Sequence, residues 1–316
     1  MSERRITAAK RRTVSDGRAL DPFLDWSFKY IFGKPEHEDL MRGFIDLMLF
    51  GKKTVKSIEF LNPENIPDDP DSVKCIFDIL CKDENGDQFL VEVQKKSVDN
   101  MRDRLLFYSC RLITSSGHDT TVRDWGYNLK KVYTICLMDY VTDGSKEVRS
   151  DFYLRDGSNG EVFSDKLHII LLRLPNLKSK PFDECADSYE KMLILLKQMQ
   201  GGMNRINELM KGIDTSLHLD EYTDELFRRL LTVADDAALS REERNSYDYW
   251  MKIARDNYCV MDYERKHGYE EGRAEGRAEG RAEGILEIAR NLKANGIPLE
   301  TISKCTGLDD SVVAGL

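Results

Sequence analysis

Two neighbouring apolar segments around an Asn-Gly pair constrain the fold of this chain more than any other feature. Residues 74–82 (KCIFDILCK) and 88–95 (QFLVEVQK) are rich in strand-forming residues and flank the Asn-Gly at 85–86. This arrangement predicts a β-hairpin, because Asn and Gly tolerate the positive φ of tight turns. Each segment also holds one acid among apolar residues, Asp78 and Glu92. Carboxylates are depleted in strands and are costly to bury alone, so both acids need an explanation.

The register of the hairpin decides whether the two acids share a face of the sheet. A two-residue turn places Asp78 and Glu92 on opposite faces, because side chains alternate along a strand. A loop of three or five residues centred on Asn85 instead pairs Asp78 with Glu92, at about 5 Å between Cβ atoms. A shared site therefore predicts a loop of odd length, or an equivalent bulge. Gln94 lies two residues after Glu92 and so has its side chain on the same face.

Two paired carboxylates suit the binding of a divalent cation for phosphodiester hydrolysis. A bound cation offsets the charge that develops during the reaction and lowers the pKa of an attacking water. Mg²⁺ and Mn²⁺ prefer oxygen ligands, among which carboxylates serve well. The alternative is that the two acids lie on a solvated sheet face or pair with lysines near them in sequence, namely Lys74, Lys82 and Lys95.

The first half of the chain has the pattern of an α/β protein and the second half is helical. Helices are expected at 23–32, 40–50 and 99–115, strands at 57–61, 132–138 and 168–174, a second hairpin joining 152–154 to 162–163, and a polar loop at 63–71. The segment 132–138 is almost wholly apolar, as in a central strand covered on both faces. Long helical patterns follow at 183–200, 221–238 and 241–266. We therefore expect a mixed β-sheet core flanked by helices, with an α-helical C-terminal region.

Residues 270–284 (EEGRAEGRAEGRAEG) form a four-residue repeat. Equal charges recur four residues apart, which opposes a helix, and each interior Gly costs about 1 kcal/mol relative to Ala. A helix here needs a partner, such as a second copy packing along the Gly and Ala positions, and a flexible linker is the alternative. Residues 285–316 predict two short helices that resemble a helix-turn-helix. Such pairs are common without DNA binding, so DNA contact by this pair is the less favoured interpretation.

Composition limits the partners and the compartment. The 316 residues are 41% hydrophobic and carry a net charge of -9, so contact with DNA needs a local basic surface. The basic stretch 1–20 is either a disordered arm or a DNA-seeking one. The seven cysteines form no C-x-x-C pair, which favours reduced thiols in the cytoplasm over disulfides or zinc. No signal peptide or bilayer-long apolar run is visible, so no membrane association is expected.

Several short motifs follow one another in a fixed order from residue 21. They are Asp21-Pro22, Asp25, Phe28-Lys29, Ile31-Phe32-Gly33, Phe60-Leu61-Asn62-Pro63-Glu64, Phe77-Asp78-Ile79, Asp83-Glu84-Asn85-Gly86, Val91-Glu92-Val93-Gln94, Arg104 and Tyr108. This set resembles the PD-(D/E)XK nuclease superfamily, in which an acid on one strand and E-x-K on the next hold a metal. Within that superfamily it looks most like the Rpn-type recombination-promoting nucleases, a transposase family.

The resemblance implies a restriction-endonuclease-like fold and a metal-dependent endonuclease that acts on DNA, in recombination or DNA mobility. The alternative is a catalytically weak or inactive nuclease-fold protein that binds DNA or a partner. We divide the chain into a basic arm (1–20), a nuclease core (21–180), a helical region (181–268), and the repeat with the terminal helices (269–316). The helical C-terminal region is expected to mediate homo-oligomerisation.

The resemblance also implies that Asp78 and Glu92 bind the metal, Mg²⁺ or Mn²⁺, together with the carbonyl of Val93. Gln94 stands where the wider superfamily has Lys, although the Rpn-type group commonly has Gln there. A glutamine amide orients a water but supplies no positive charge. Lys95 and Lys96 are candidate substitutes, yet Lys95 is expected on the face opposite to Gln94.

Three further residues are weaker candidates for the site. Asp25 is either a further acid from the first helix or the N-cap of that helix. Arg104 and Arg111 lie seven residues apart on one helical face. They either contact DNA phosphates or only solvate that face.

Overall fold

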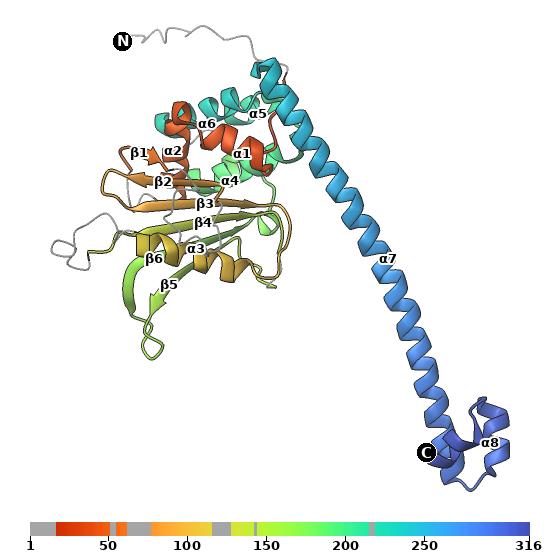
Figure 1. The fold of residues 1–316 in the computed structure, drawn as a ribbon. Coiled ribbons are helices and arrows are strands. Elements are labelled where there is room, and N and C mark those ends of the chain that lie inside the picture. Colours follow the sequence, from red (N-terminus) through yellow and green to blue (C-terminus); the bar gives the residue numbers. More distant parts are fainter. Residues whose placement is uncertain (1–16, 51–54, 62–76, 116–127, 142–143, 215–218) are drawn as a thin grey trace, which may run out of the picture. The chain divides into compact units, whose positions relative to one another are not determined.

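A six-stranded sheet forms the centre of the first part of the chain in this computed structural model (Figure 1). Its strands are β1 (Ile58–Phe60), β2 (Ile79–Asp83), β3 (Gln88–Gln94), β4 (Val132–Met138), β5 (Arg149–Arg155) and β6 (Val162–Arg173). They are ordered β1-β2-β3-β4-β6-β5 across the sheet. β3, β4 and β6 are parallel, whereas β1 and β2, β2 and β3, and β5 and β6 pair antiparallel. The expected mixed sheet is therefore confirmed.

The structure describes residues 17–50, 55–61, 77–115, 128–141, 144–214 and 219–316. The polar loop expected at 63–71 and residues 1–16 of the basic arm lie outside these ranges. The chain divides into two compact units, of which the first ends at Trp250 and the second is Met251–Leu316.

Helices cover both faces of the sheet in the first unit (Figure 1). α3 (Met101–Ser115) lies on one face. On the other side lie α1 (Asp25–Phe32), α2 (Glu38–Met48), α4 (Ser188–Met199), α5 (Ile206–Asp214) and α6 (Glu221–Val233). Because both faces are covered, β4 is buried along almost its whole length, as its apolar sequence predicts.

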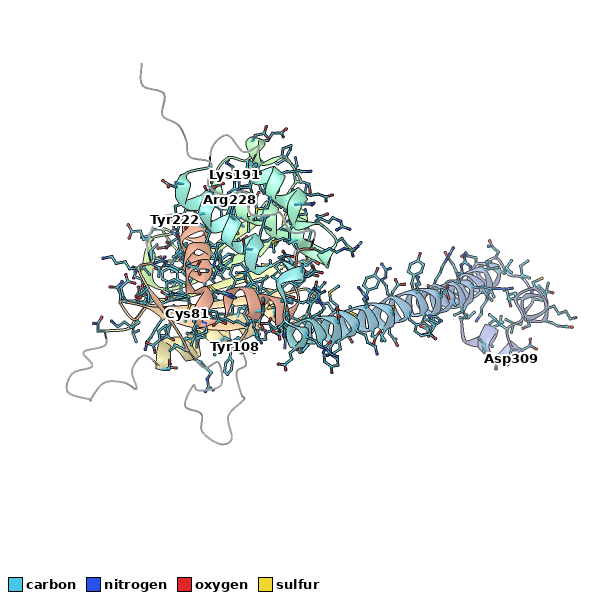
Figure 2. All side chains as sticks on the ribbon, turned by 90° about the horizontal axis from the view of Figure 1, so that it is seen from above. Cys81, Tyr108, Lys191, Tyr222, Arg228 and Asp309 are labelled. Atoms are coloured by element: carbon cyan, nitrogen blue, oxygen red, sulfur yellow. The ribbon has the colours of Figure 1, made fainter. Side chains whose placement is uncertain are left out.

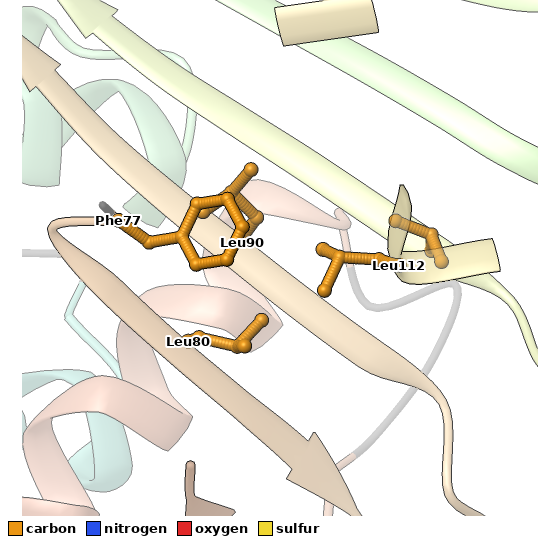
Figure 3. Packing of buried hydrophobic residues seen from close by; sticks show 5 residues of the cluster. Phe77, Leu80, Leu90 and Leu112 are labelled. Atoms are coloured by element: carbon orange, nitrogen blue, oxygen red, sulfur yellow. The ribbon is translucent and has the colours of Figure 1, made fainter. Parts of the chain in front are cut away.

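The hairpin β2–β3 is anchored to α3 by apolar packing. Phe77, Leu80, Leu90 and Leu112 form a buried cluster together with Val132 (Figure 3). These contacts hold the strand ends that carry the two acids against a fixed helix. Since a fully buried Leu or Phe contributes roughly 1.5–3 kcal/mol, this cluster is sufficient to fix the position of the hairpin.

The prediction of two separate strands at 162–163 and 168–174 is wrong. β6 is one strand, Val162–Arg173, and it pairs with β5 through a bulged register. The polar residues at 164–166 interrupted the apolar pattern. The N-terminal half of β6 is largely exposed, so strand pairing there does not require an apolar side chain at every second position.

The helical region differs from the sequence prediction in two places. The nine-residue α5 was not predicted. α7 extends over Arg241–Ala294, so the helix expected at 241–266 continues through the repeat, and the linker alternative for the repeat is wrong. None of the described helices has the length and apolar character needed to cross a membrane.

The second unit ends in a small helical cluster. The C-terminal turns of α7 pack with α8 (Leu299–Thr306) and α9 (Asp310–Gly315) around Ala289, Ile302 and Val313. α8 ends at Gly307, whose φ of 75° gives the left-handed cap that a glycine adopts without strain. The predicted helix closing at this glycine is confirmed, whereas α9 was not predicted.

Candidate active site

The register of the β2–β3 hairpin brings the two acids together. β2 pairs with β3 so that Ile79 lies opposite Val91, and residues 83–87 join the last paired residues, Lys82 and Gln88. The loop is thus odd in length, as a shared site requires, and this prediction is confirmed. Continued by one residue, the same register sets Asp78 opposite Glu92.

The hairpin loop fixes this register through its own hydrogen bonds. The buried carboxylate of Asp83 accepts the backbone N–H groups of Asn85 and Asp87, each at 2.9 Å. Gly86 has a φ of 78°, and its N–H donates to the carbonyl of Asp83 at 2.9 Å. A side-chain hydrogen bond within the loop therefore selects five residues over the two-residue turn that Asn-Gly alone suggests.

Each acid contacts the backbone that carries the other. The N–H of Val93 donates to Oδ2 of Asp78 at 2.8 Å. The N–H of Asp78 lies 3.3 Å from Oε1 of Glu92. Glu92 is only 2% exposed, which rules out the alternative of a solvated sheet face for this acid. Asp78 is half-buried, with a side chain that is 18% exposed.

Gln94 and Arg104 both lie against Glu92. Nε2 of Gln94 is 3.4 Å from Oε2 of Glu92, so the two side chains share a face as strand alternation predicts. Nη2 of Arg104, on α3, is 3.5 Å from the same oxygen. Arg104 therefore places a positive charge beside Glu92, whereas Arg111 packs over the ring of Phe107.

Helix α1 brings a third acid and a lysine to Asp78. Nζ of Lys29 lies 2.7 Å from Oδ1 of Asp25 and 3.9 Å from Oδ1 of Asp78. Asp25 is the first residue of α1, while Leu24 occupies the N-cap position without a side-chain hydrogen bond. The N-cap interpretation of Asp25 is therefore wrong.

The lysines near the acids in sequence have other partners. Lys82 binds Glu59 at 3.1 Å, and Lys95 binds the buried Asp21 at 2.8 Å. Lys95 thus lies away from Gln94, as expected, and does not supply the missing positive charge beside Glu92. Lys74 lies outside the described residues.

Burial leaves the pair of acids short of positive charge. Burial raises the pKa of Glu92, the charge of Asp78 raises it further, and Arg104 opposes this only in part. Burial likewise raises the pKa of Asp78, and nearby Asp25 adds to the rise, whereas the N–H of Val93 and the charge of Lys29 oppose it. Two adjacent buried carboxyl groups lose a proton reluctantly unless a further cation is present.

Two buried polar atoms near the site, Nε of Arg104 and the hydroxyl of Tyr140, have no hydrogen-bond partner among the described residues. Tyr140 packs against the cluster that contains Cys136, which pairs with Glu92 across β3 and β4. Burial raises the pKa of this hydroxyl, and the charge of Arg104 lowers it. Both atoms are hydrogen-bond donors, so each is a buried polar group that costs free energy as long as it has no acceptor. Tyr140 was not predicted from the sequence, because a single tyrosine just after a strand looks the same whether or not it lies near a site.

The donor chemistry of the site fits a hard cation. No group of three or more His, Cys, Asp or Glu side chains in the described ranges is arranged to hold a metal ion. The set here is smaller, the two carboxylates of Asp78 and Glu92. Mg²⁺ usually retains several waters and needs only one or two carboxylates, so this set is sufficient for it.

A mixed sheet between helical layers, with acids from two adjacent strands facing each other, is the architecture of a restriction-endonuclease-like nuclease. A model of the PD-(D/E)XK nuclease family transposases matches residues 22–264. This match covers most of the chain, and the chain belongs to that family. No curated protein and no solved structure matches it. The family indicates a nuclease-type function with DNA as substrate, and its nucleases typically use divalent metals.

Proposed function

We propose that this protein is a divalent-metal-dependent DNA endonuclease whose site is formed by Asp78, Glu92 and Gln94. The observation that carries the proposal is a buried Glu92 beside a half-buried Asp78, each accepting a backbone N–H from the segment that carries the other. Arg104 and Lys29 offset the charge of these two acids only in part. Mg²⁺ or Mn²⁺ would be held by the two carboxylates and the carbonyl of Val93. A role in recombination or DNA mobility accords with the transposase family.

The residues of the site have separate roles in this proposal. A metal bound here supplies charge for the phosphate and lowers the pKa of a water. The amide of Gln94 donates to Glu92 and presents its carbonyl oxygen to a water. Arg104 contributes the positive charge that Gln94 lacks, with Nη2 3.5 Å from Oε2 of Glu92. Asp25 and Lys29 set the charge around Asp78 from α1.

We assign this chemistry to residues 21–180, with 181–268 as a supporting helical region. The segment 269–316 then serves homo-oligomerisation, and the basic stretch 1–20 is a candidate arm for DNA. A second candidate function is a nuclease-fold module that binds DNA without efficient cleavage. The specific observation in its favour is that Gln94 is uncharged and that Lys95 is bound to Asp21.

A cleavage assay on duplex DNA with Mg²⁺ or Mn²⁺ tests the proposal. We expect Asp78→Asn and Glu92→Gln to lower the cleavage rate by roughly 100-fold or more, because ligand loss exceeds the 10–100-fold effect of losing a supporting contact. Glu59→Gln is the matched control, since Glu59 is an exposed acid on the neighbouring strand β1 that binds Lys82.

The outcomes separate the two candidates. Equal rates for the wild type and both site variants would reject this site. No cleavage by any form, combined with DNA binding that Arg104→Ala weakens, would favour the binding module instead.

A further inference from the structure

One side of α3 carries arginines and aromatic rings at helical spacing, and this set begins at the candidate active site. Arg104, Phe107, Tyr108 and Arg111 lie on the same side of the helix, because each residue is rotated by about 100° from the one before it. Nη2 of Arg104 is 3.5 Å from Oε2 of Glu92, so the set starts beside the acids. Arg111 lies about 10 Å further along the helix axis. We call these four residues the α3 row.

The side chains of the α3 row contact one another and the core. The guanidinium of Arg104 lies over the ring of Tyr108, 5.8 Å from its centroid. Arg111 lies over the ring of Phe107 at the same distance. Tyr108, at the periphery of the first unit in Figure 2, also packs edge-on against the buried ring of Phe77, with 5.0 Å between the centroids. Because Phe77 belongs to the cluster that fixes the hairpin, one core holds both the α3 row and the acids in place.

The helix α3 is a basic surface in an acidic chain. It contains Arg102, Arg104 and Arg111 but only one acid, Asp103. The whole chain, in contrast, carries a net charge of -9. Contact with DNA needs a local basic surface of this kind, because contacts between cationic side chains and phosphates supply most of the sequence-independent affinity. The α3 row therefore suits the backbone of a DNA strand that leads away from the site.

Phe107 distinguishes this surface from one that attracts only phosphates. It is 43% exposed even though Arg111 lies over its ring. An exposed aromatic ring makes no favourable contact with a phosphate, but it stacks on the face of any nucleobase. In an intact duplex the neighbouring base pairs cover these faces, and opening a base step costs free energy. An exposed ring beside two arginines therefore favours a strand whose bases are already unpaired.

We propose that Phe107 and Arg111 bind unpaired nucleotides next to the scissile phosphate, so that the preferred substrate is DNA with an unpaired stretch at the cut. Phe107 stacks on a base, and Arg111 binds the backbone beside it. This inference rests on the DNA substrate of the proposed function and deepens it by naming the DNA structure that the site prefers. If the contacts between arginines and rings only stabilise α3, the protein does not distinguish paired from unpaired DNA through this helix.

Binding of DNA by the full-length chain, measured without cleavage, tests the preference. Fluorescence anisotropy in the presence of a chelator compares probes that share one labelled strand: the single strand, the full duplex, and a duplex with a short central bubble of unpaired nucleotides. We expect the wild type to bind the bubble and the single strand roughly tenfold more tightly than the duplex. Equal affinity for all the probes would overturn this inference and leave the proposed nuclease function standing. No binding of any probe would count against both.

Two substitutions at Phe107 test the stacking. Phe107→Ala should raise the Kd for the bubble roughly tenfold and leave the Kd for the duplex nearly unchanged, whereas Phe107→Trp retains a stacking ring and should retain the preference. The matched control is Leu106→Ala. Leu106 is 47% exposed, but it lies outside the α3 row and lines an apolar pocket with Phe152 and Leu154 of β5. Equal losses on the bubble and on the duplex, or the same loss from Leu106→Ala, would contradict stacking by Phe107.

The salt dependence of binding tests Arg111. Each lost contact with a phosphate of a single strand reduces the slope of log K against log salt concentration by about 0.7. Arg111→Gln should reduce the slope for the single-stranded probe by this amount, whereas Arg102→Gln, an exposed arginine of α3 outside the row, should leave it nearly unchanged. An unchanged slope for Arg111→Gln would reject the backbone contact. Thermal unfolding of each variant, with midpoints expected close to that of the wild type, separates a lost contact from a lost fold.

Discussion

We expect the two acids of the proposed site, Asp78 and Glu92, to destabilise the protein when no cation accompanies them. Glu92 is almost fully buried next to Asp78, and the compensation by Arg104 is partial. Natural sites of this kind trade stability for function. A comparison of the free energy of unfolding with and without metal therefore tests whether Asp78 and Glu92 bind a cation.

We predict that Glu92→Gln stabilises the metal-free protein by about 1–2 kcal/mol at pH 8, because it removes a buried charge and keeps the shape. Urea unfolding in the presence of a chelator measures this. Added Mg²⁺ should then raise the unfolding midpoint of the wild type and leave that of the variant nearly unchanged. A variant that is less stable than the wild type without metal would show that Glu92 is a structural acid.

Another acid, Asp151 on the edge strand β5, has the opposite pH dependence. Arg149 contacts both of its carboxylate oxygens at 2.6 and 2.7 Å, and His168 lies 2.7 Å away. Burial opposes the shift, but the hydrogen bonds with Arg149 and His168 outweigh it and lower the pKa of Asp151 below its usual value. A lowered folded-state pKa stabilises the protein above the usual pKa of about 3.9, and this stabilisation is lost as pH falls toward the folded-state value.

Asp151→Asn should therefore lower the free energy of unfolding by roughly 1–2 kcal/mol at pH 7. The difference from the wild type should shrink steadily below pH 4. Unfolding series across this pH range measure it, and Asp165→Asn is the control, because Asp165 makes one exposed ion pair with Lys131. A penalty that stays constant down to pH 2 would contradict a role for the charge of Asp151.

The two acids could be identified from the sequence because each interrupts an otherwise apolar strand. A single residue is enough to show such an interruption. The sequence also indicated Gln94 through strand alternation, and Lys95 on the other face for the same reason. It did not identify Tyr140, since that contact arises only when β4 is set beside β3. Residues that act through tertiary proximity alone leave no local pattern.

At the scale of elements, the hairpin loop determines whether there is a site at all. Asn-Gly on its own suggests a two-residue turn, and that turn would separate the acids. The carboxylate of Asp83 decides for five residues by accepting two backbone N–H groups. The residue types in the loop are compatible with more than one register, and the hydrogen bonds of the Asp83 side chain select one of them.

Gly86→Ala should destabilise the protein by about 1 kcal/mol or more, because alanine at a φ of 78° is strained. Gly86→Asn is the control, since asparagine tolerates this conformation better. Thermal unfolding measures both, and cleavage should fall with Ala more than with Asn if the register loosens. Equal stability of the two variants would mean that the loop adapts freely.

Other elements show where sequence patterns are weak. The segment 132–138 is apolar throughout, and β4 has those same limits. The sequence predicted two strands in place of β6, because the exposed half of β6 contains polar residues that interrupt the apolar pattern. The helix α5 was not predicted, because its nine residues are too few to show a clear helical periodicity. Elements whose residues alternate between buried and exposed positions, or are buried throughout, can be predicted from the sequence. Exposed or short elements depend on tertiary contacts that the local sequence does not show.

At the scale of the whole molecule, the two units have different sources of stability. The first contains a sheet with apolar packing against α3. The second contains a long exposed helix and a small cluster around Ala289, Ile302 and Val313. The sites proposed for metal and for a second copy fall in different units.

Thermal unfolding should accordingly occur in two transitions, since two-state behaviour is expected of single domains. The transition of the tail should move to higher temperature as protein concentration rises, because a dimer dissociates when it unfolds. The transition of the first unit should move with Mg²⁺ instead. Circular dichroism at two protein concentrations, each with Mg²⁺ and with a chelator, measures both, and the Glu92→Gln chain should lose only the response to Mg²⁺. A single transition that responds to both would show that the two units unfold together, and the metal site and the tail would then be coupled rather than independent.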